Sequence, residues 1–315
     1  MKLFAPDYYK YFSCIADKCG HSCCVGWEID IDADTLEYYR SVKGTLGKRM
    51  KESISEDGDS PHFVLSENER CPFLDENNLC DIILTLGEDR LCQICSDHPR
   101  YRNFFGSRVE TGLGLCCEAA AGLILSYRQK TRLVMLDDDG IDTQPDGVEQ
   151  AFFAAREKLF EAAQNREKTI EGRINDILSI CGMKMPLKSD SEWADIFLTL
   201  ERLDSEWTRR LYILKDSPVS VISWDKNRWD IEFEQLLIYF LYRHMADSLY
   251  DGRFKERAAF AVLSVRVIYA LFILSNTYTI SELAEIVRMY SSEIEYCEEN
   301  METLLKVLGE QQTTL

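Results

Sequence analysis

The sequence is short of several kinds of residue, and each shortage excludes a class of protein. Lysine and arginine number only 36 against 54 aspartates and glutamates, so the formal net charge is -18. A chain this acidic lacks the basic surface that binding to nucleic-acid phosphates requires. We therefore expect a protein partner rather than a nucleic acid, although a high net charge also serves solubility alone.

Long hydrophobic runs are also absent. The longest apolar run, residues 258–274, is interrupted by Ser264 and Arg266, whereas a bilayer span needs about 18 consecutive apolar residues. Residues 1–7 contain no continuous apolar segment of the kind found in secretory signals. We therefore expect no membrane association and a cytoplasmic location.

Cysteine is scarce after residue 117 but dense before it. Of the 12 cysteines, only Cys181 and Cys297 lie in the later part of the chain. In a reducing compartment, dense cysteines bind metal or do redox chemistry more often than they form disulfides. We interpret the two isolated cysteines as buried packing residues, and we expect the metal chemistry in the N-terminal part.

The N-terminal cysteines form two blocks, which begin at Cys14 and Cys71. Thiolates are soft ligands that bind zinc or iron-sulfur clusters strongly. Adjacent cysteines such as Cys23 and Cys24 suit a ligand loop, because neighbouring side chains on a helix or strand point in different directions. The spacing therefore predicts a metal centre shared by the two blocks, with iron-sulfur and zinc both open.

The N-terminal part shows only short regular elements. Residues 27–32 alternate apolar and acidic side chains, which predicts a half-buried strand, and Asp32 or Asp34 can cap a helix that ends near Gly44. Residues 81–86 and 119–128 have the composition of helices. We expect an irregular cysteine-rich metal-binding domain with short strands over residues 1–136.

The rest of the chain is predicted to be helical. Like charges with glycine and proline at residues 137–147 indicate a domain boundary. Beyond it, hydrophobic residues recur at helical spacing, with a break around Pro218. We therefore expect a mainly α protein in which residues 148–315 form a mostly helical domain, a bundle of packed helices.

Several motifs resemble those of one known family, the flagellin lysine-N-methylases. These are Cys-Cys-Val-Gly-Trp-Glu-Ile-Asp-Ile-Asp at residues 23–32, Cys-Pro-Phe-Leu-Asp at 71–75, His-Pro-Arg at 98–100, Tyr-Phe-Leu-Tyr-Arg at 239–243 and Tyr-Ser-Ser-Glu-Ile-Glu at 290–295. The N-terminal part is also similar to a cysteine-rich group described as chelating zinc or iron. The resemblance covers essentially the whole chain.

The resemblance implies a protein lysine N-methyltransferase that uses S-adenosylmethionine as methyl donor and flagellin as protein substrate. It also implies a cysteine-ligated centre, either a 4Fe-4S iron-sulfur cluster or zinc. Cys92 and Cys116 are additional to the family pattern; each is either a substitute ligand or a packing residue, and we favour the packing role. The positions that match the family's ligands are Cys14, Cys19, Cys23, Cys24, Cys71, Cys80, Cys95 and Cys117.

A lysine with an ordinary pKa of about 10.4 must lose its proton before its nitrogen can accept a methyl group. Acidic or phenolic groups near an aromatic wall suit this task. The matching motifs at 239–243, 250–252 and 290–295 offer five candidates, although residues of these types at such positions are more often core residues or helix caps. They are Tyr239, Tyr242, Asp251, Tyr290 and Glu293.

The donor-binding residues are not visible in the sequence. Residues 110–114 contain two glycines but lack the third glycine of a dinucleotide-binding turn, so we interpret them as part of the metal domain. The main alternative function is a metal-chelating or electron-transfer protein without methyltransfer activity. A dithiol redox role for Cys92 and Cys95 is a third interpretation.

Overall fold

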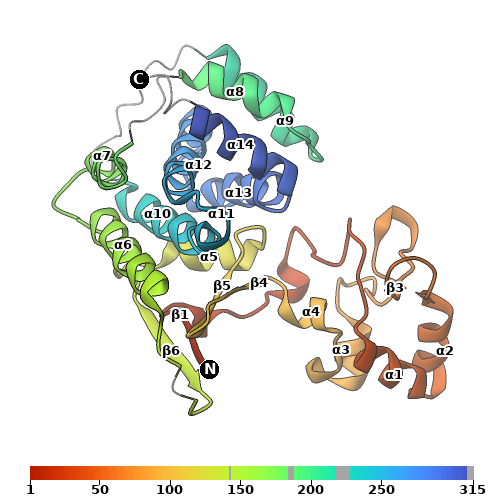
Figure 1. Cartoon of the computed structure of the whole chain (residues 1–315). Coiled ribbons are helices and arrows are strands. Elements are labelled where there is room, and N and C mark those ends of the chain that lie inside the picture. Colours follow the sequence, from red (N-terminus) through yellow and green to blue (C-terminus); the bar gives the residue numbers. More distant parts are fainter. Residues whose placement is uncertain (142, 184–187, 218–227, 311–315) are drawn as a thin grey trace. The chain divides into compact units, whose positions relative to one another are not determined.

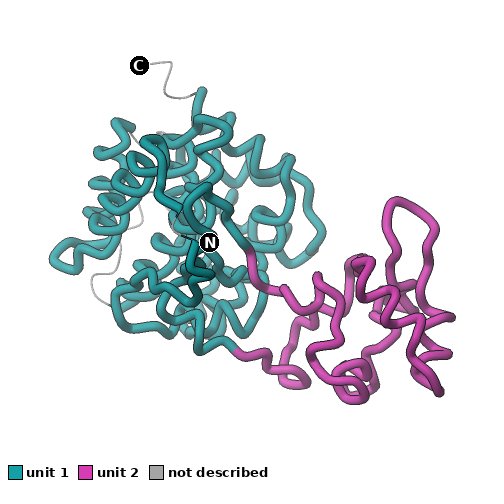
Figure 2. Tube along the Cα trace, turned by 60° about the horizontal axis from the view of Figure 1, so that its bottom comes forward, with its two compact units in different colours: residues 1–12, 102–315 teal, residues 13–101 magenta. Residues whose placement is uncertain are grey.

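The computed structural model of the chain describes residues 1–141, 143–183, 188–217 and 228–310. The chain divides into two compact units, drawn in different colours in Figure 2. Unit 1 comprises Met1–Phe12 and Arg102–Leu315, and unit 2 comprises Ser13–Tyr101. These units differ from the division that we expected at residues 137–147, and the break expected around Pro218 lies outside the described residues. The mainly α fold class is confirmed.

Unit 2 is built from short helices and very short strands. Its loops carry three single-turn 3-10 helices, η2 (Ala16–Lys18), η3 (Glu67–Glu69) and η4 (Glu88–Arg90). Its regular elements are α1 (Ala33–Ser41), α2 (Gly44–Ser53), β2 (Ile54–Ser55), β3 (His62–Phe63), α3 (Asp81–Leu86) and α4 (Gln93–Asp97).

The first helix of unit 2 starts where the sequence predicts. The side chain of Asp32 accepts a hydrogen bond from the Thr35 amide at 3.0 Å, which caps α1. The strand predicted at residues 27–32 is wrong as a strand. Its apolar residues Ile29 and Ile31 are buried as expected. The segment does not form a strand, because it pairs with the two-residue strand β3 through one bridge, between Asp30 and His62.

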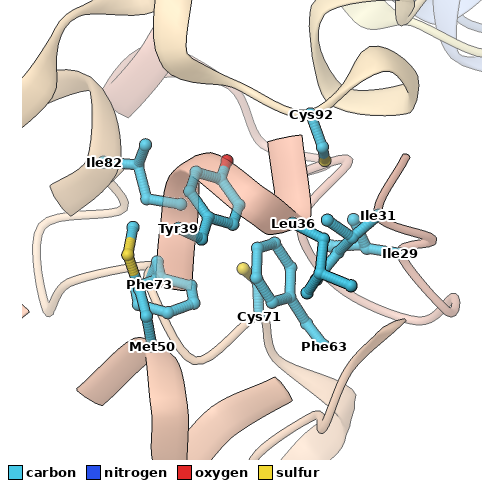
Figure 3. Close-up of a cluster of buried hydrophobic side chains, with 10 residues drawn as sticks. All are labelled: Ile29, Ile31, Leu36, Tyr39, Met50, Phe63, Cys71, Phe73, Ile82 and Cys92. Atoms are coloured by element: carbon cyan, nitrogen blue, oxygen red, sulfur yellow. The ribbon is translucent and has the colours of Figure 1, made fainter. Parts of the chain in front are cut away.

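The core of unit 2 is small and includes sulfur. Figure 3 shows aromatic and aliphatic side chains from α1, α2 and α3 packed together with two cysteine thiols. The ring centre of Phe63 lies 6.1 Å from the ring centre of Tyr39 and 4.9 Å from that of Phe73. The cluster consists of Ile29, Ile31, Leu36, Tyr39, Met50, Phe63, Cys71, Phe73, Ile82 and Cys92.

A four-stranded sheet joins the start of the chain to later segments. Its strands are β1 (Lys2–Pro6), β4 (Arg100–Phe104), β5 (Arg108–Leu113) and β6 (Leu133–Asp138), in the order β4-β5-β1-β6. β1 runs parallel to β5 and antiparallel to β6. We did not expect this sheet from the sequence, and it explains why residues 1–12 and 102–136 belong with the helical part.

Helices make up the rest of unit 1, and Figure 1 shows them gathered around α10 and α12. α12 is long and apolar enough to cross a bilayer, but 83% of its apolar window is buried in the structure, as in the core helix of a globular unit. The elements are η1 (Tyr9–Tyr11), α5 (Glu118–Ser126), α6 (Gly147–Ala163), α7 (Ile170–Ile180), α8 (Asp190–Thr199), α9 (Ser205–Asp216), α10 (Asp230–His244), α11 (Ser248–Asp251), α12 (Phe254–Leu274), α13 (Ile280–Tyr290), the π-helical turn η5 (Ser291–Glu295) and α14 (Glu298–Glu310).

Candidate functional site

Five thiols from separate stretches of unit 2 come together. The Cys71 amide donates to the Cys24 carbonyl at 2.8 Å, and a β-bridge joins their neighbours Arg70 and Val25. These backbone contacts bring the first cysteine block against the second. The thiols that interact with one another there are those of Cys24, Cys71, Cys80, Cys92 and Cys95.

The pKa values of these thiols depend on one another. A hydrogen bond between Cys92 and Cys95 lowers the pKa of Cys92 and, together with burial, raises that of Cys95. The hydrogen bond from Cys23 lowers the pKa of Cys24 to about 7, although burial acts against it. Burial raises the pKa of Cys71 to about 12. Thiols this close together gain stability when a cation replaces their protons.

Of the other predicted ligands, Cys23 touches the cluster through its hydrogen bond to Cys24, and the remaining three have other surroundings. Cys14 is exposed, and its sulfur accepts the Ala16 amide at 3.4 Å. The Cys19 thiol donates to the His21 carbonyl at 3.3 Å. Cys117 belongs to unit 1, where it precedes α5 as its N-terminal cap residue.

The donor set of the cluster suits a thiolate-bound metal centre. Zinc and iron-sulfur clusters each take four sulfur ligands in their common all-cysteine sites, and the cluster offers five thiols. Cys92, which we expected to be a packing residue, is one of the five. Within the part of the chain that the structure describes, however, no group of three or more His, Cys, Asp or Glu side chains is placed so that it could hold a metal ion.

A second candidate centre lies in unit 1, around the fully buried carboxylate of Glu295. It accepts from the Tyr239 hydroxyl at 3.1 Å and lies 2.6 Å from His244 Nε2. The Arg243 guanidinium is 3.4 Å away. Glu295 is the last residue of the π-helical turn η5, and such turns are frequent at functional sites. We call these four side chains the Glu295 network.

The network extends to the surface through one aromatic ring. Arg243 Nη1 donates to the Tyr239 hydroxyl at 2.7 Å, and the Arg243 guanidinium stacks 4.8 Å from the ring centre of Tyr296. Tyr296 is 53% exposed, and a hydrogen bond joins it to the Cys116 thiol. The neighbouring Leu115 amide donates to the Tyr239 hydroxyl at 3.2 Å. The turn before α5 therefore forms one wall of this centre.

Burial and charge set the protonation of the network. Burial raises the pKa of Glu295, but the Arg243 charge and the His244 hydrogen bond outweigh it, so the pKa lies below its ordinary value. Burial lowers the pKa of His244 more than Glu295 raises it. Burial raises the pKa of Tyr239 well above 10. At neutral pH the network therefore holds a carboxylate, a neutral imidazole and a neutral phenol.

The structure gives the other four predicted catalytic residues separate surroundings. Tyr242 donates to the Thr111 carbonyl at 3.0 Å, and Asp251 pairs with Arg257 at 2.7 Å. The Tyr290 hydroxyl donates to Ser264 Oγ at 2.8 Å in the core. Glu293 accepts the amides of Leu203 and Asp204 at 2.9 and 2.6 Å, just before α9. Of the five candidates, only Tyr239 belongs to the Glu295 network.

Two other buried carboxylates are held by arginines alone. Glu110 accepts two hydrogen bonds of 2.7 Å from Arg156, and Glu234 pairs with Arg166 and Arg173 at 2.8 Å. Glu110 lies in β5, so the glycine-containing segment 110–114 belongs to unit 1 rather than to a metal domain. The Glu295 network differs from both pairs because it includes a phenol and an imidazole, and imidazole is the side chain whose ordinary pKa lies near neutral pH.

We did not single out Glu295, Arg243 and His244 from the sequence. The signal that could have indicated them is the placement of Glu295 in the Tyr-Ser-Ser-Glu-Ile-Glu motif, two residues after Glu293. A π-helical turn inserts one residue per turn relative to an α-helix. Helical spacing therefore does not indicate which of the two glutamates faces α10.

Comparison with known proteins locates the shared region. The FliB lysine N-methylase C-terminal domain matches residues 221–315. The chain is 31% identical over 127 residues to the lysine-N-methylase of Salmonella choleraesuis, which is 38% of this chain and 32% of that protein. It is 30% identical over 127 residues to the flagellar biosynthetic protein FliU of Salmonella muenchen, with 38% of this chain and 75% of that protein covered. The chain thus matches about a third of the length of the lysine-N-methylase. No solved structure matches.

Proposed function

The chain belongs to the FliB lysine-N-methylase family, and from this premise we propose that it is a cytoplasmic enzyme that methylates lysine side chains of flagellin with S-adenosylmethionine. The observation that carries the proposal is the position of the Glu295 network. Its four residues, at 239, 243, 244 and 295, all lie in the segment 221–315 that the family shares.

The chemistry required is the transfer of a methyl group to a neutral amine. Bound S-adenosylmethionine supplies an electrophilic methyl group; the lysine nitrogen forms the new C–N bond, the C–S bond breaks, and its electron pair remains on sulfur. The lysine must first give up a proton, and its pKa falls when the ammonium is desolvated or lies near another cation. A lysine placed against the ring of Tyr296, which stacks on Arg243, would lie near such a cation at the edge of the network.

The network offers a group that can take the proton. His244 is neutral at pH 7 because burial lowers its pKa, and its Nε2 lies 2.6 Å from Glu295. A carboxylate in this position stabilises the protonated imidazole. Tyr239 stays a neutral phenol that donates to Glu295 and accepts from Arg243 and Leu115, so we assign it a positioning role.

We propose that unit 2 holds the metal centre of the enzyme. Cys24, Cys71, Cys80, Cys92 and Cys95 offer one more thiol than a four-sulfur site needs. When bound, the metal would fix the two cysteine blocks together and so support the fold of unit 2. Cys23 is a further proposed ligand beside Cys24, to which it is hydrogen-bonded. Cys14, Cys19 and Cys117 remain proposed ligands from the family resemblance alone.

Co-expression with flagellin tests the proposal. We expect flagellin purified with the intact chain to gain mass in steps of one methyl group, and peptide mapping to place the gain on lysines. Glu295→Gln should reduce the gain, and Glu302→Gln is the matched control, because Glu302 is a 60% exposed carboxylate paired with Arg253. Unchanged flagellin mass with the intact, folded, metal-loaded protein would contradict the proposal.

The thiol cluster favours one alternative, a metal-chelating or electron-transfer protein without methyltransfer activity. The same experiment separates the two functions. Metal bound by the cysteines together with unmodified flagellin supports the alternative, whereas methylation that depends on the donor supports the enzyme.

A further inference from the structure

The edge strand β6 exposes apolar side chains in an unusual way. Val134, Met135 and Leu136 are consecutive residues with 36, 53 and 39% of their surface exposed. Successive side chains of a strand point to opposite faces, so β6 presents apolar groups to solvent on both faces. Contiguous exposed apolar groups of this kind mark surfaces that another chain covers.

The backbone of β6 is also free along one side. Among the described residues, β6 pairs only with β1, which lies on one side of it. Alternate amide and carbonyl groups of β6 therefore point away from the sheet. Figure 1 shows β6 next to β1 at the margin of the sheet. Such an edge can add an extended peptide as a further strand, with backbone hydrogen bonds supplying affinity.

The charge at the end of β6 indicates the partner. Asp137 and Asp138 are exposed and follow the apolar residues directly. They add to a chain whose formal net charge is -18. Acidic groups at the end of an apolar edge complement a peptide in which lysine accompanies apolar residues. A second copy of this chain would instead bring further negative charge to the same place.

We propose that β6 is a docking edge for an extended, lysine-bearing segment of the protein substrate. The segment pairs with the β6 backbone and covers Met135 and Leu136. A flanking lysine, distinct from the one that is methylated, lies against Asp137 and Asp138. The choice of occupant rests on the function proposed above, whereas the docking edge itself rests on the exposure and pairing of β6.

Hydrogen exchange on the full chain tests the docking directly, with monomeric flagellin as the probe. We expect the amides of residues 133–138 to exchange more slowly when flagellin is present, and those of α9 to be unchanged. Unchanged exchange in β6 at saturating flagellin would overturn the proposal. Slower exchange that depends only on the concentration of the chain, without flagellin, would also overturn it, because the occupant would then be a second copy.

Variants connect docking to turnover. Met135→Lys combined with Leu136→Lys should raise the KM for flagellin at least about tenfold without lowering kcat, because charges on an edge strand prevent pairing. Tyr212→Lys is the matched control, since Tyr212 has the same exposure of 53% on α9. Asp137→Asn combined with Asp138→Asn should raise KM less, and added salt should remove that difference.

The experiments distinguish a failure of the docking edge from a failure of the proposed function. If the intact chain methylates flagellin but the double lysine variant keeps the KM of the intact chain, only the docking edge is wrong. If flagellin protects β6 but gains no methyl groups, only the proposed function is wrong. Circular dichroism of each variant confirms that β6 substitutions have not unfolded unit 1.

Discussion

Unit 2 places sulfur in its core, whereas unit 1 places ionised side chains in its core. Ten buried residues form the cluster at the centre of unit 2, and two of them are cysteines. In unit 1, helices such as α10 and α12 are buried along most of their length, and Glu110, Glu234 and Glu295 lie among them with their partners.

From this difference we propose that unit 2 is the unit that depends on a metal. A small core supplies little stability by itself, and metals commonly provide what is missing in such units. The core of unit 1 is large enough to bury charged groups when each has a partner. We therefore expect metal loss to affect the fold of unit 2, and network substitutions to affect the chemistry in unit 1.

The largest effect should come from breaking the thiol cluster. Cys71→Ser should remove bound metal, abolish methylation and unfold unit 2, because a buried thiol of the cluster is lost. Metal analysis and circular dichroism measure both effects, and the helical signal of unit 1 should remain. Cys297→Ser is the control, since Cys297 contacts Glu201 rather than another cysteine. Full metal content in Cys71→Ser would contradict this role.

The next effect should come from the Glu295 network. Glu295→Gln should lower kcat for flagellin by about 100-fold, the scale of a lost acid-base group. It should also destabilise unit 1 by roughly 3–5 kcal/mol, because Arg243 is left without its buried partner. Metal content should not change. A variant with normal kcat would limit the network to a structural role.

Acid pH should weaken unit 1 through His244. Its pKa in the folded state lies below the ordinary value of about 6.5, so the unfolded chain binds this proton first. The contribution of neutral His244 to the free energy of unfolding is therefore fully present above pH 6.5 and decreases as the pH falls below 6.5. The unfolding temperature should fall between pH 7.5 and 5.5, and this fall should be smaller in His244→Gln. An equal pH dependence in both proteins would mean that another group is responsible.

The smallest effect should come from Tyr290. Tyr290→Phe removes one neutral hydrogen bond to Ser264 and keeps the ring among Phe197, Trp207 and Phe240. Because the bond joins two neutral groups, we expect a loss of about 1 kcal/mol in unfolding free energy and an unchanged kcat. Denaturant unfolding measures the free energy of unfolding, and steady-state kinetics measure kcat. A large fall in kcat at normal stability would instead give Tyr290 a part in the chemistry.

The sequence predicted local features better than long-range ones. The Asp32 cap, the end of α3 at Gly87 and the helical spacing beyond residue 147 depend on neighbouring residues, and the structure confirms them. The sheet could not be predicted, because β1 pairs with strands more than 100 residues away. For the same reason the Glu295 network went unrecognised, since Glu295 lies more than 50 residues from its partners Tyr239, Arg243 and His244.

Sulfur coordination is the most direct test of the central claim, that thiols of both cysteine blocks hold one metal centre in unit 2. The measurement is X-ray absorption spectroscopy of the anaerobically purified full chain, combined with metal analysis. We predict a zinc or iron edge with sulfur neighbours at about 2.3 Å, lost in both Cys24→Ser and Cys71→Ser. A metal with only nitrogen and oxygen neighbours, or sulfur coordination that persists in both variants, would contradict it.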